Sequence, residues 1–248
     1  MGSQIKVLGV KFDAVTKSEA AARIFAASQR KSDRPFTVVT PNPIMVMNAQ
    51  DNDLLFSALT YADLSLADGV GIISAAKRIG TPLPERVTGI DTAYSVIEKL
   101  AEVGGSIYLL GAKPGVAEKA AEKLTENLPS LRIAGTHHGY FEDDEKILSD
   151  IKEKSPDLLA VCLGSPRQEI WVYENKEKLS GVGAVMCLGG ALDVWSGNIK
   201  RAPKLFIKLR LEWLWRMLRE PKRFKELPKM IKFRLLTRKS RQKGGNIK

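Results

Sequence analysis

Short apolar runs alternate with amphipathic segments along most of this chain, and this alternation limits the possible folds more than any other feature. The runs lie at residues 5–10, 36–40, 63–67, 106–110, 131–135, 157–163 and 182–188. Helical patterns lie between them, at 17–31, 43–61 with a break at Asp51, 69–79, 91–103, 114–127, 142–154 and 166–178. Near-continuous apolar strands that alternate with helices are typical of a mostly parallel sheet with helices on both faces. We therefore predict a doubly wound, Rossmann-like α/β body over residues 1–199.

Charge is divided unevenly between this body and the rest of the chain. Residues 200–248 contain 18 Lys and Arg against 3 Glu, whereas residues 1–199 contain 21 Lys and Arg against 25 Asp and Glu. A surplus of 15 and a deficit of 4 together give the net charge of +11. Residues 204–219 and 222–237 have helical patterns, and the first has a broad apolar arc. We predict a basic, amphipathic helical appendage over 200–248 that binds an anionic partner, with a disordered polar end from Thr237.

Three roles are open for the appendage: nucleic-acid binding, packing on the body, or lying at a membrane surface with Lys and Arg against anionic lipid. Each basic residue near such a surface contributes about 1 kcal/mol, and we find no nucleic-acid motif. No apolar run reaches the roughly 20 residues of a membrane span, and the chain shows no signal-peptide pattern, so we expect a cytoplasmic protein. Cys162 and Cys187 lie in apolar runs and are expected to be buried thiols.

Three of the predicted strands end in glycine that is followed at once by the start of a helix. These corners occupy residues 109–116, 163–170 and 188–193, with glycines Gly111, Gly164, Gly189 and Gly190. Helix N-termini present N–H groups and a partial positive charge, so neighbouring corners suit a diphosphate, to which Lys113 and Arg167 would add charge. Such turns also need glycine, proline and capping residues for structural reasons alone, and Ser165 with Gln168 fits a capping box. The residues leave both interpretations open.

Asp68 ends an apolar run and is followed by the turn Gly69-Val70-Gly71. This turn partly matches a dinucleotide fingerprint, with Asp91 at the distance of a ribose contact. The match is weak because Ser74 replaces the third glycine and Asp91 begins a helix. Asp68 therefore acts either as a general base at the carboxyl end of a strand or as the N-cap of the next helix.

The sequence does not indicate a metal site. Asp51-Asn52-Asp53 resembles a D-x-D metal motif, but it lies at a helix break, where we expect Asp to cap the next helix. His137 and His138 are adjacent, would point apart in a strand, and are expected to shape a turn before Gly139. We therefore predict that the site contains no metal and no cofactor.

Taken together, these motifs resemble those of the WecG/TagA/CpsF family of glycosyltransferases. The resemblance extends from about residue 5 to about 235, with two departures, Leu192 where Phe is common and Arg167 where Lys is common. The matching stretches are 40–43 (TPNP), 67–71 (ADGVG), 84–91 (PERVTGID), 110–115 (LGAKPG), 135–141 (GTHHGYF), 163–169 (LGSPRQE), 189–197 (GGALDVWSG), 201–203 (RAP) and 211–214 (LEWL).

The resemblance implies a metal-independent, inverting transfer of a sugar from a UDP donor to an undecaprenyl-diphosphate-linked acceptor. In the TagA type, which the chain most resembles, N-acetylmannosamine passes from UDP-N-acetylmannosamine to the C4 hydroxyl of GlcNAc-diphosphoundecaprenol, a step of wall teichoic acid synthesis. Relatives use the uronic acid of this sugar, or glucose, so another UDP-sugar is the alternative donor. A nucleotide-binding or nucleic-acid-binding protein without catalysis is the alternative of another class.

The resemblance also assigns roles to residues. The aspartate that matches Asp68 is the proposed catalytic base in the family, with the threonine matching Thr40 beside the site and the glutamine matching Gln168 in the donor pocket. Inversion needs one base to take a proton from the attacking hydroxyl, which a carboxylate can do. We expect Arg86 to face the diphosphate. The expected substrate-binding residues are Asn42, Gly111, Lys113, Gly164, Arg167, Gln168, Gly189, Gly190, Asp193, Arg216 and Arg223.

A lipid-linked acceptor requires access to a membrane, so the membrane role of the appendage is favoured over packing and over nucleic-acid binding. In the family the appendage is taken to target the membrane and to help close the active site. We expect a protein that is peripheral on the inner face of the cell membrane, and the family also suggests a homo-oligomer.

Overall fold

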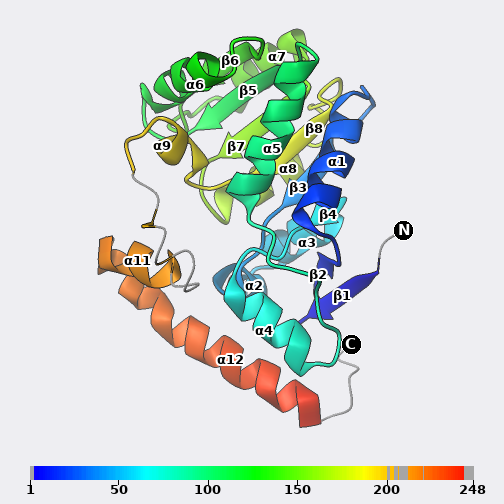
Figure 1. Cartoon of the computed structure of the whole chain (residues 1–248), viewed down its shortest axis with the longest axis vertical. Coiled ribbons are helices and arrows are strands. Elements are labelled where there is room, and N and C mark those ends of the chain that lie inside the picture. Colours follow the sequence, from blue (N-terminus) through cyan, green and yellow to red (C-terminus); the bar gives the residue numbers. More distant parts are fainter. Residues whose placement is uncertain (1–2, 200–201, 204–205, 207–211, 220, 243–248) are drawn as a thin grey trace.

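The computed structural model describes residues 3–199, 202–203, 206, 212–219 and 221–242. Within these residues, six strands form one parallel sheet in the order β4-β3-β8-β7-β5-β6 (Figure 1). The strands are β3 (Phe36–Val39), β4 (Leu64–Ser65), β5 (Ser106–Gly111), β6 (Arg132–His137), β7 (Leu158–Cys162) and β8 (Ala184–Cys187). The prediction of a doubly wound, mostly parallel α/β fold is confirmed.

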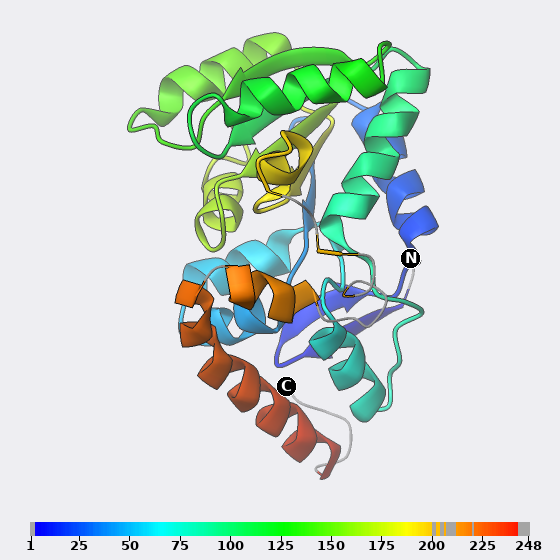
Figure 2. The same ribbon diagram turned by 60° about the vertical axis from the view of Figure 1, so that its left-hand side comes forward.

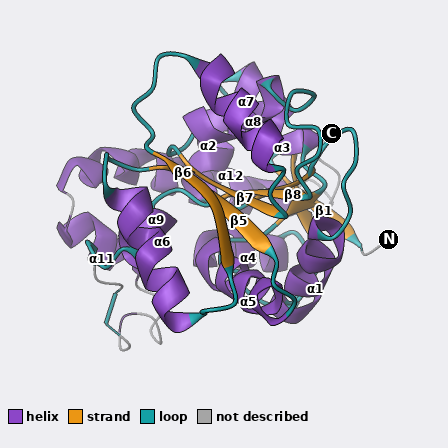
Figure 3. Cartoon of the chain, turned by 90° about the horizontal axis from the view of Figure 1, so that it is seen from above, coloured by secondary structure: helices purple, strands orange, loops and turns teal. Residues whose placement is uncertain are grey.

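Helices cover both faces of this sheet (Figures 1 and 3). One face carries α1 (Lys17–Ser28), α5 (Gly89–Glu102), α6 (Val116–Asn127) and α9 (Ala191–Trp195), whose apolar side chains form one core cluster with the sheet. The cluster on the other face contains side chains of α2 (Pro43–Ala49), α3 (Asp53–Tyr61), α4 (Val70–Arg78), α7 (Asp144–Lys154) and α8 (Arg167–Glu174). The central strands are therefore buried on both sides.

The side chains of β5 show why these strands have near-continuous apolar sequences. Ile107 and Leu109 belong to the cluster with α5 and α6, whereas Tyr108 and Leu110 belong to the cluster with α7 and α8. Successive residues of a strand point to opposite faces, and all four side chains are at most 1% exposed. Burying one such side chain contributes about 1.5–3 kcal/mol, so both faces contribute to the stability of the sheet.

The first apolar run forms a hairpin and not a strand of the main sheet, so that part of the prediction is wrong. β1 (Gln4–Val7) and β2 (Val10–Asp13) pair antiparallel across a turn at Leu8 and Gly9, both with positive φ. Phe12, which is fully buried, packs in the cluster that contains α2, α3 and α4. Asp13 joins the hairpin to the sheet because its Oδ2 accepts a hydrogen bond of 2.8 Å from the Ser65 N–H.

Helix starts follow capping rules, with one difference from prediction. Asn52, and not an aspartate, caps α3, since its Oδ1 accepts a hydrogen bond of 2.9 Å from the Leu55 N–H. Asn42 caps α2 in the same way, with bonds from the N–H groups of Ile44 (2.9 Å) and Met45 (3.1 Å). The Asp51-Asn52-Asp53 segment is thus a capping segment, as expected.

The C-terminal part contains α11 (Glu212–Arg219), the 3₁₀ helix η1 (Pro221–Glu226) and α12 (Leu227–Gln242). Of the first predicted helix, residues 204–205 and 207–211 lie outside the described residues. The second predicted helix is divided in two: its first turns form the tighter 3₁₀ helix η1, and the rest forms α12. The disorder predicted from Thr237 is wrong up to Gln242, which lies in α12. Among the described residues, no helix has the length and apolar character needed to cross a membrane.

Helix α12 packs across α2 and α4, as Figures 1 and 2 show. Phe233 is 3% exposed there, and the Arg78 side chain donates a hydrogen bond of 2.8 Å to the Thr237 hydroxyl. A Cβ atom at Gly71 would lie 2.5 Å from Pro43 Cγ and 3.8 Å from a ring atom of Phe233. Glycine at this position therefore permits α2, α4 and α12 to meet closely.

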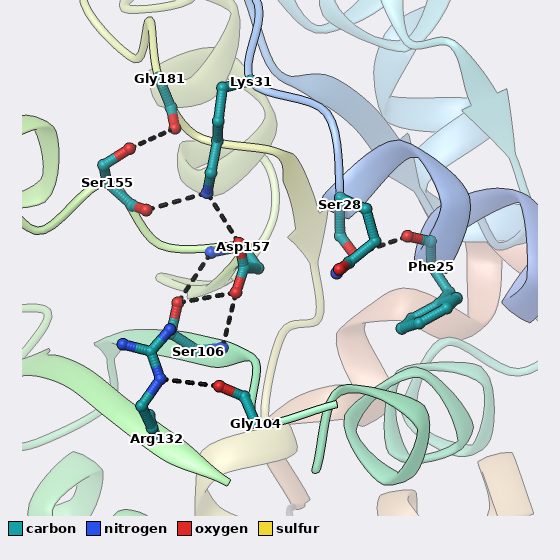
Figure 4. Close-up of polar contacts among 10 residues, drawn as sticks. Phe25, Ser28, Lys31, Gly104, Ser106, Arg132, Ser155, Asp157 and Gly181 are labelled. Atoms are coloured by element: carbon teal, nitrogen blue, oxygen red, sulfur yellow. Dashed lines mark hydrogen bonds and ion pairs between the residues drawn. The ribbon is translucent and has the colours of Figure 1, made fainter. Parts of the chain in front are cut away.

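At the amino edge of the sheet, Asp157 joins four segments of the chain (Figure 4). Its Oδ2 accepts hydrogen bonds from the N–H (2.8 Å) and hydroxyl (3.0 Å) of Ser106, and its Oδ1 lies 2.9 Å from Lys31 Nζ. Lys31 also donates to the Ser155 carbonyl, and the Ser155 hydroxyl donates to the Gly181 carbonyl. Burial alone would raise the pKa of Asp157, but the Lys31 ammonium and the Ser106 groups together lower it below its ordinary value.

We expect Asp157→Ala to lower the free energy of unfolding by about 2 kcal/mol at neutral pH, because Lys31 and Ser106 lose a charged acceptor. The folded-state pKa lies below the ordinary value of 3.8, so the stabilisation is present above that pH and is lost as the pH falls through the folded pKa. Urea titrations from neutral to acid pH should show the difference from wild type shrinking. Asp33→Ala, at an exposed residue of the loop that carries Lys31, is the control, and a pH-independent difference would contradict the assignment.

Candidate active site

The carboxyl ends of the strands bring most of the predicted residues to one edge of the sheet. Thr40 follows β3, Asp68 follows β4 after two residues, and the glycine corners follow β5, β7 and β8. Parallel strands end at the same edge, which is where ligands bind in open α/β sheets. The arrangement therefore gives a candidate site that extends from β4 to β5.

Asp68 lies beside Arg86 at the β4 end of this edge. The Val87 N–H bonds to the Ala67 carbonyl at 3.2 Å, which fixes the segment that carries Arg86. Arg86 Nη2 lies 3.4 Å from Asp68 Oδ1, and the two side chains are 23% and 32% exposed. Helix α4 has Gly69 at its N-cap, without a side-chain cap. The alternative that Asp68 caps this helix is therefore wrong, and its carboxylate reaches solvent beside a cation.

Thr40 and Asn42 follow β3, next to Asp68. The Thr40 hydroxyl donates a hydrogen bond of 3.2 Å to the Cys187 carbonyl at the end of β8. A Cβ atom at Gly89 would lie 2.7 Å from Thr40 Cγ2, so the first turn of α5 also meets Thr40. Because the Oδ1 of Asn42 caps α2, a ligand contact by Asn42 would have to use its amide nitrogen.

The corner after β5 is tightly built. Gly111 has φ +135°, and a Cβ atom there would lie 2.3 Å from the Cys162 carbonyl oxygen. Helix α6 begins after Gly115, at φ +82°, without a side-chain cap. The Lys113 side chain in this corner is exposed. The corner thus combines an uncapped helix N-terminus with an exposed cation, which suits a phosphate.

The corner after β7 also begins a helix without a side-chain cap, since Pro166 is the N-cap of α8. The capping box predicted for Ser165 and Gln168 is therefore wrong. Arg167 Nη1 donates a hydrogen bond of 2.6 Å to the Gly139 carbonyl, and its guanidinium carbon lies 4.7 Å from the centroid of the Phe141 ring. Arg167 thereby joins this corner to the loop after β6.

The histidines of that loop lie at the expected turn, and they do not point apart as neighbours in a strand would. The ring centroids of His137 and His138 lie 4.6 Å apart, because the chain turns directly after β6 and His137 Nδ1 lies 2.8 Å from the His138 carbonyl. The Gly139 N–H then bonds to the Ala112 carbonyl at 2.8 Å. The expected turn is present, and it connects the β5 and β7 corners.

The corner after β8 directs its N–H groups at protein atoms. The Gly189 N–H donates a hydrogen bond of 2.9 Å to Gln168 Oε1. The N–H groups of Leu192 and Ala191 face the Cys162 thiol, whose pKa burial nevertheless raises to about 12. Both cysteines are buried and free, as predicted. These contacts favour the β5 and β7 corners over the β8 corner as the place for a phosphate.

Gln168 and Glu169 form a buried polar pair behind this corner. They are 3% and 2% exposed, and Gln168 Nε2 donates a hydrogen bond of 2.6 Å to Glu169 Oε1. Burial raises the pKa of Glu169, against the opposing effects of the Gln168 and Ser165 side chains. Sequence reasoning did not single out Glu169, although an acid directly after a glycine corner was the available signal.

Three further predicted residues lie toward the C-terminal part. Asp193 is half-buried in α9, and its backbone carbonyl accepts a hydrogen bond of 2.9 Å from the Ile199 N–H. The side chains of Arg216 and Arg223 lie outside the part of the chain that the structure describes. Among the described residues, no three His, Cys, Asp or Glu side chains are grouped so that they could hold a metal ion.

The sequence of this chain matches a known protein family. A sequence profile described as "Glycosyl transferase WecG/TagA/CpsF family" matches residues 5–246. The chain belongs to this family. The WecG/TagA/CpsF match includes the C-terminal helices as well as the sheet.

Two relatives have the same name, N-acetylglucosaminyldiphosphoundecaprenol N-acetyl-beta-D-mannosaminyltransferase. The protein from Bacillus spizizenii is 34% identical over 196 residues, which cover 79% of this chain and 76% of the relative. The protein from Staphylococcus aureus (strain MW2) is 32% identical over 243 residues, which cover 97% of this chain and 94% of the relative. This chain therefore aligns with these two relatives over 76% and 94% of their lengths.

The two glycines of the β5 corner give a matched test of the geometry. Gly115→Ala meets no atom within 4 Å and should cost about 1 kcal/mol through its left-handed backbone. Gly111→Ala should cost about 2 kcal/mol more, because the Cys162 carbonyl must move. Chemical denaturation of the two variants and wild type measures the difference, and equal stabilities would contradict the close approach.

Proposed function

We propose that this protein transfers N-acetylmannosamine from UDP-N-acetylmannosamine to the C4 hydroxyl of GlcNAc-diphosphoundecaprenol. The observation that carries the proposal is the match to relatives of this name over 79% and 97% of this chain, within a family match that includes the sheet and the C-terminal helices. The arrangement of the edge supports it, since a solvent-accessible carboxylate lies at one end and uncapped helix N-termini lie toward the other.

Asp68 acts as the general base in this proposal. Its carboxylate takes the proton of the acceptor hydroxyl while that oxygen bonds to the anomeric carbon of the donor sugar. The bond from this carbon to the diphosphate oxygen breaks, and UDP leaves with the electron pair, so the configuration inverts. A positioned base of this kind contributes about 10²–10⁴-fold in rate. No metal takes part in this proposed step.

The nucleotide extends from the helix N-termini of the β5 and β7 corners, where Lys113 is a neighbouring cation, toward the sugar beside Asp68. Arg86, beside Asp68, stabilises negative charge as UDP departs. We propose that Arg216 and Arg223 of the C-terminal helices supply further positive charge to the diphosphate. In this proposal residues 1–199 form the catalytic body and residues 200–248 form the appendage.

The decisive experiment compares acceptor-dependent UDP release from UDP-N-acetylmannosamine by wild type and Asp68→Asn. We expect the variant to lose at least about 100-fold in rate, because the amide cannot take the proton. Asp51→Asn, at an exposed aspartate outside the site, is the matched control. Undiminished release by Asp68→Asn would exclude the base role. Release by wild type only from another UDP-sugar would change the donor, and oligonucleotide binding without UDP release would favour the non-catalytic class.

We also propose that the C-terminal helices lie on the anionic inner face of the cell membrane. Large apolar side chains are exposed on them: Trp213, Leu218, Phe224, Ile231 and Leu235. The described residues of α12 also include the exposed cations Lys229, Lys232, Arg234 and Arg238. Exposed apolar side chains next to clustered cations are the combination with which amphipathic helices bind anionic lipid surfaces.

Ile231→Glu combined with Leu235→Glu tests this surface. These side chains are 60% and 53% exposed, so the changes should leave the fold intact. They should weaken cosedimentation with anionic liposomes by at least about tenfold, through lost apolar contact and added negative charge. Leu54→Glu with Val103→Glu, at body residues of similar exposure, adds the same charge elsewhere. An equal loss in both variants would mean that charge alone is measured and would contradict the proposed surface.

A further inference from the structure

We infer that Glu169 is a positioning residue of this site, whose buried carboxyl sets the orientation of the Gln168 amide and thereby fixes the turn between β8 and α9. The inference rests on the proposed function only in taking this edge of the sheet as the place where the UDP-sugar binds. Glu169 itself need not touch the ligand.

The contacts form a short relay. Gln168 Nε2 donates to Glu169 Oε1 at 2.6 Å, and Gln168 Oε1 accepts from the Gly189 N–H at 2.9 Å. The Gln168 N–H also bonds to the Gly164 carbonyl at 2.9 Å, so the β7 corner holds the same residue. The relay therefore connects the start of α8 to the end of β8.

Besides the relay, the turn after β8 is held by the Leu188 N–H on the Val161 carbonyl at 2.9 Å and by the Ala191 N–H on the Leu188 carbonyl at 3.3 Å. Gly189 has φ +57°, and the helix that follows has only five residues. On the other side, the Thr40 hydroxyl holds the Cys187 carbonyl at 3.2 Å. The end of β8 is thus held from two sides, by Thr40 next to Asp68 and by Gln168 next to the β7 corner.

The carboxyl group of Glu169 helps to give the Gln168 amide a single orientation. An amide presents an acceptor in one orientation and a donor in the other, so two facing amides leave their arrangement open. Glu169 accepts at Oε1 and the Gly189 N–H can only donate, so Gln168 turns its Nε2 toward Glu169 and its Oε1 toward Gly189. A reversed Gln168 would place two donors against each other at the Gly189 N–H.

Burial of the Glu169 side chain destabilises the fold, so the presence of an acid at this position calls for an explanation. The residue is 2% exposed, and among the described residues no hydrogen-bond partner reaches its Oε2. Burial raises the pKa of the Cys187 thiol, and the charge of Glu169 adds to this effect. A buried carboxyl oxygen without a partner destabilises the fold, whereas an apolar side chain here would not. We attribute the acid to its control of Gln168.

Four variants test the relay. Glu169→Leu removes the acceptor, Gln168→Leu removes the amide, and the double variant removes both. Glu169→Gln keeps an acceptor in one of its two orientations. Glu174→Gln, at the exposed end of the same helix, is the matched control. The readouts are hydrogen exchange of the Gly189 amide without ligand, the Kd for UDP, and kcat and KM for the donor.

We expect Glu169→Leu to speed exchange of the Gly189 amide and to raise the Kd for UDP and the donor KM, each by at least about tenfold. We expect kcat to change less than KM, because Asp68 is untouched. Glu169→Gln should recover most of the loss, and the double variant should be no worse than Gln168→Leu, because Glu169 acts through Gln168.

Unchanged Gly189 exchange and unchanged UDP affinity in Glu169→Leu would overturn the inference, as would losses that multiply in the double variant. If Glu169→Leu does not fold, Glu169→Gln and Gln168→Leu still decide through Gly189 exchange. That readout needs no sugar or acceptor. A wild type that releases no UDP would therefore refute the proposed reaction while leaving the relay measurable.

Discussion

The six strands of the main sheet run in the same direction, and the rest of the structure depends on this arrangement. Parallel strands need crossover helices, so helices cover both faces and the strands are apolar throughout. The same arrangement gives the sheet two different edges. At the amino edge, Asp157 and Lys31 satisfy backbone and side-chain groups within the protein. At the carboxyl edge, Asp68 and Lys113 reach solvent, so binding groups are concentrated there.

The strand order sets the separation between the Asp68 carboxylate and the uncapped helix N-termini. Asp68 follows β4 at one end of the sheet, whereas the uncapped corners follow β7 and β5, which are three and four strands away. At about 4.8 Å between neighbouring strands, these corners lie farther from Asp68 than the β-phosphate can, because this phosphate is bonded to the anomeric carbon that the acceptor attacks beside Asp68. An extended donor fits this order with its nucleotide on the β7 and β5 side and its sugar near Asp68. The β8 corner lies between them, and its N–H groups are used by Gln168 and Cys162.

Much of this could be predicted from the sequence, because burial on both faces leaves a direct record in β5, β7 and β8. The hairpin could not be predicted, because residues 5–10 are as apolar as the strands of the main sheet. Only the antiparallel pairing of Val7 with Val10 in the structure distinguishes them from such a strand. The site residues on strand ends follow from the parallel fold. The burial of Gln168 and Glu169 does not, because it depends on how α8 packs against β8, and the sequence equally fits an exposed cap.

Helix α12 has a second apolar face besides the one that packs on the body. Phe233 and Thr237 pack on the body and are almost fully buried. Ile231 and Leu235 lie on the opposite side of the helix, two residues from Phe233 in each direction, and are exposed. A helix that only packed on the body would need one apolar stripe. Burial, together with the neighbouring cations Arg234 and Arg238, also lowers the pKa of Arg78, so positive charge is crowded at this end. An anionic membrane surface would relieve that repulsion and cover the second apolar face at once.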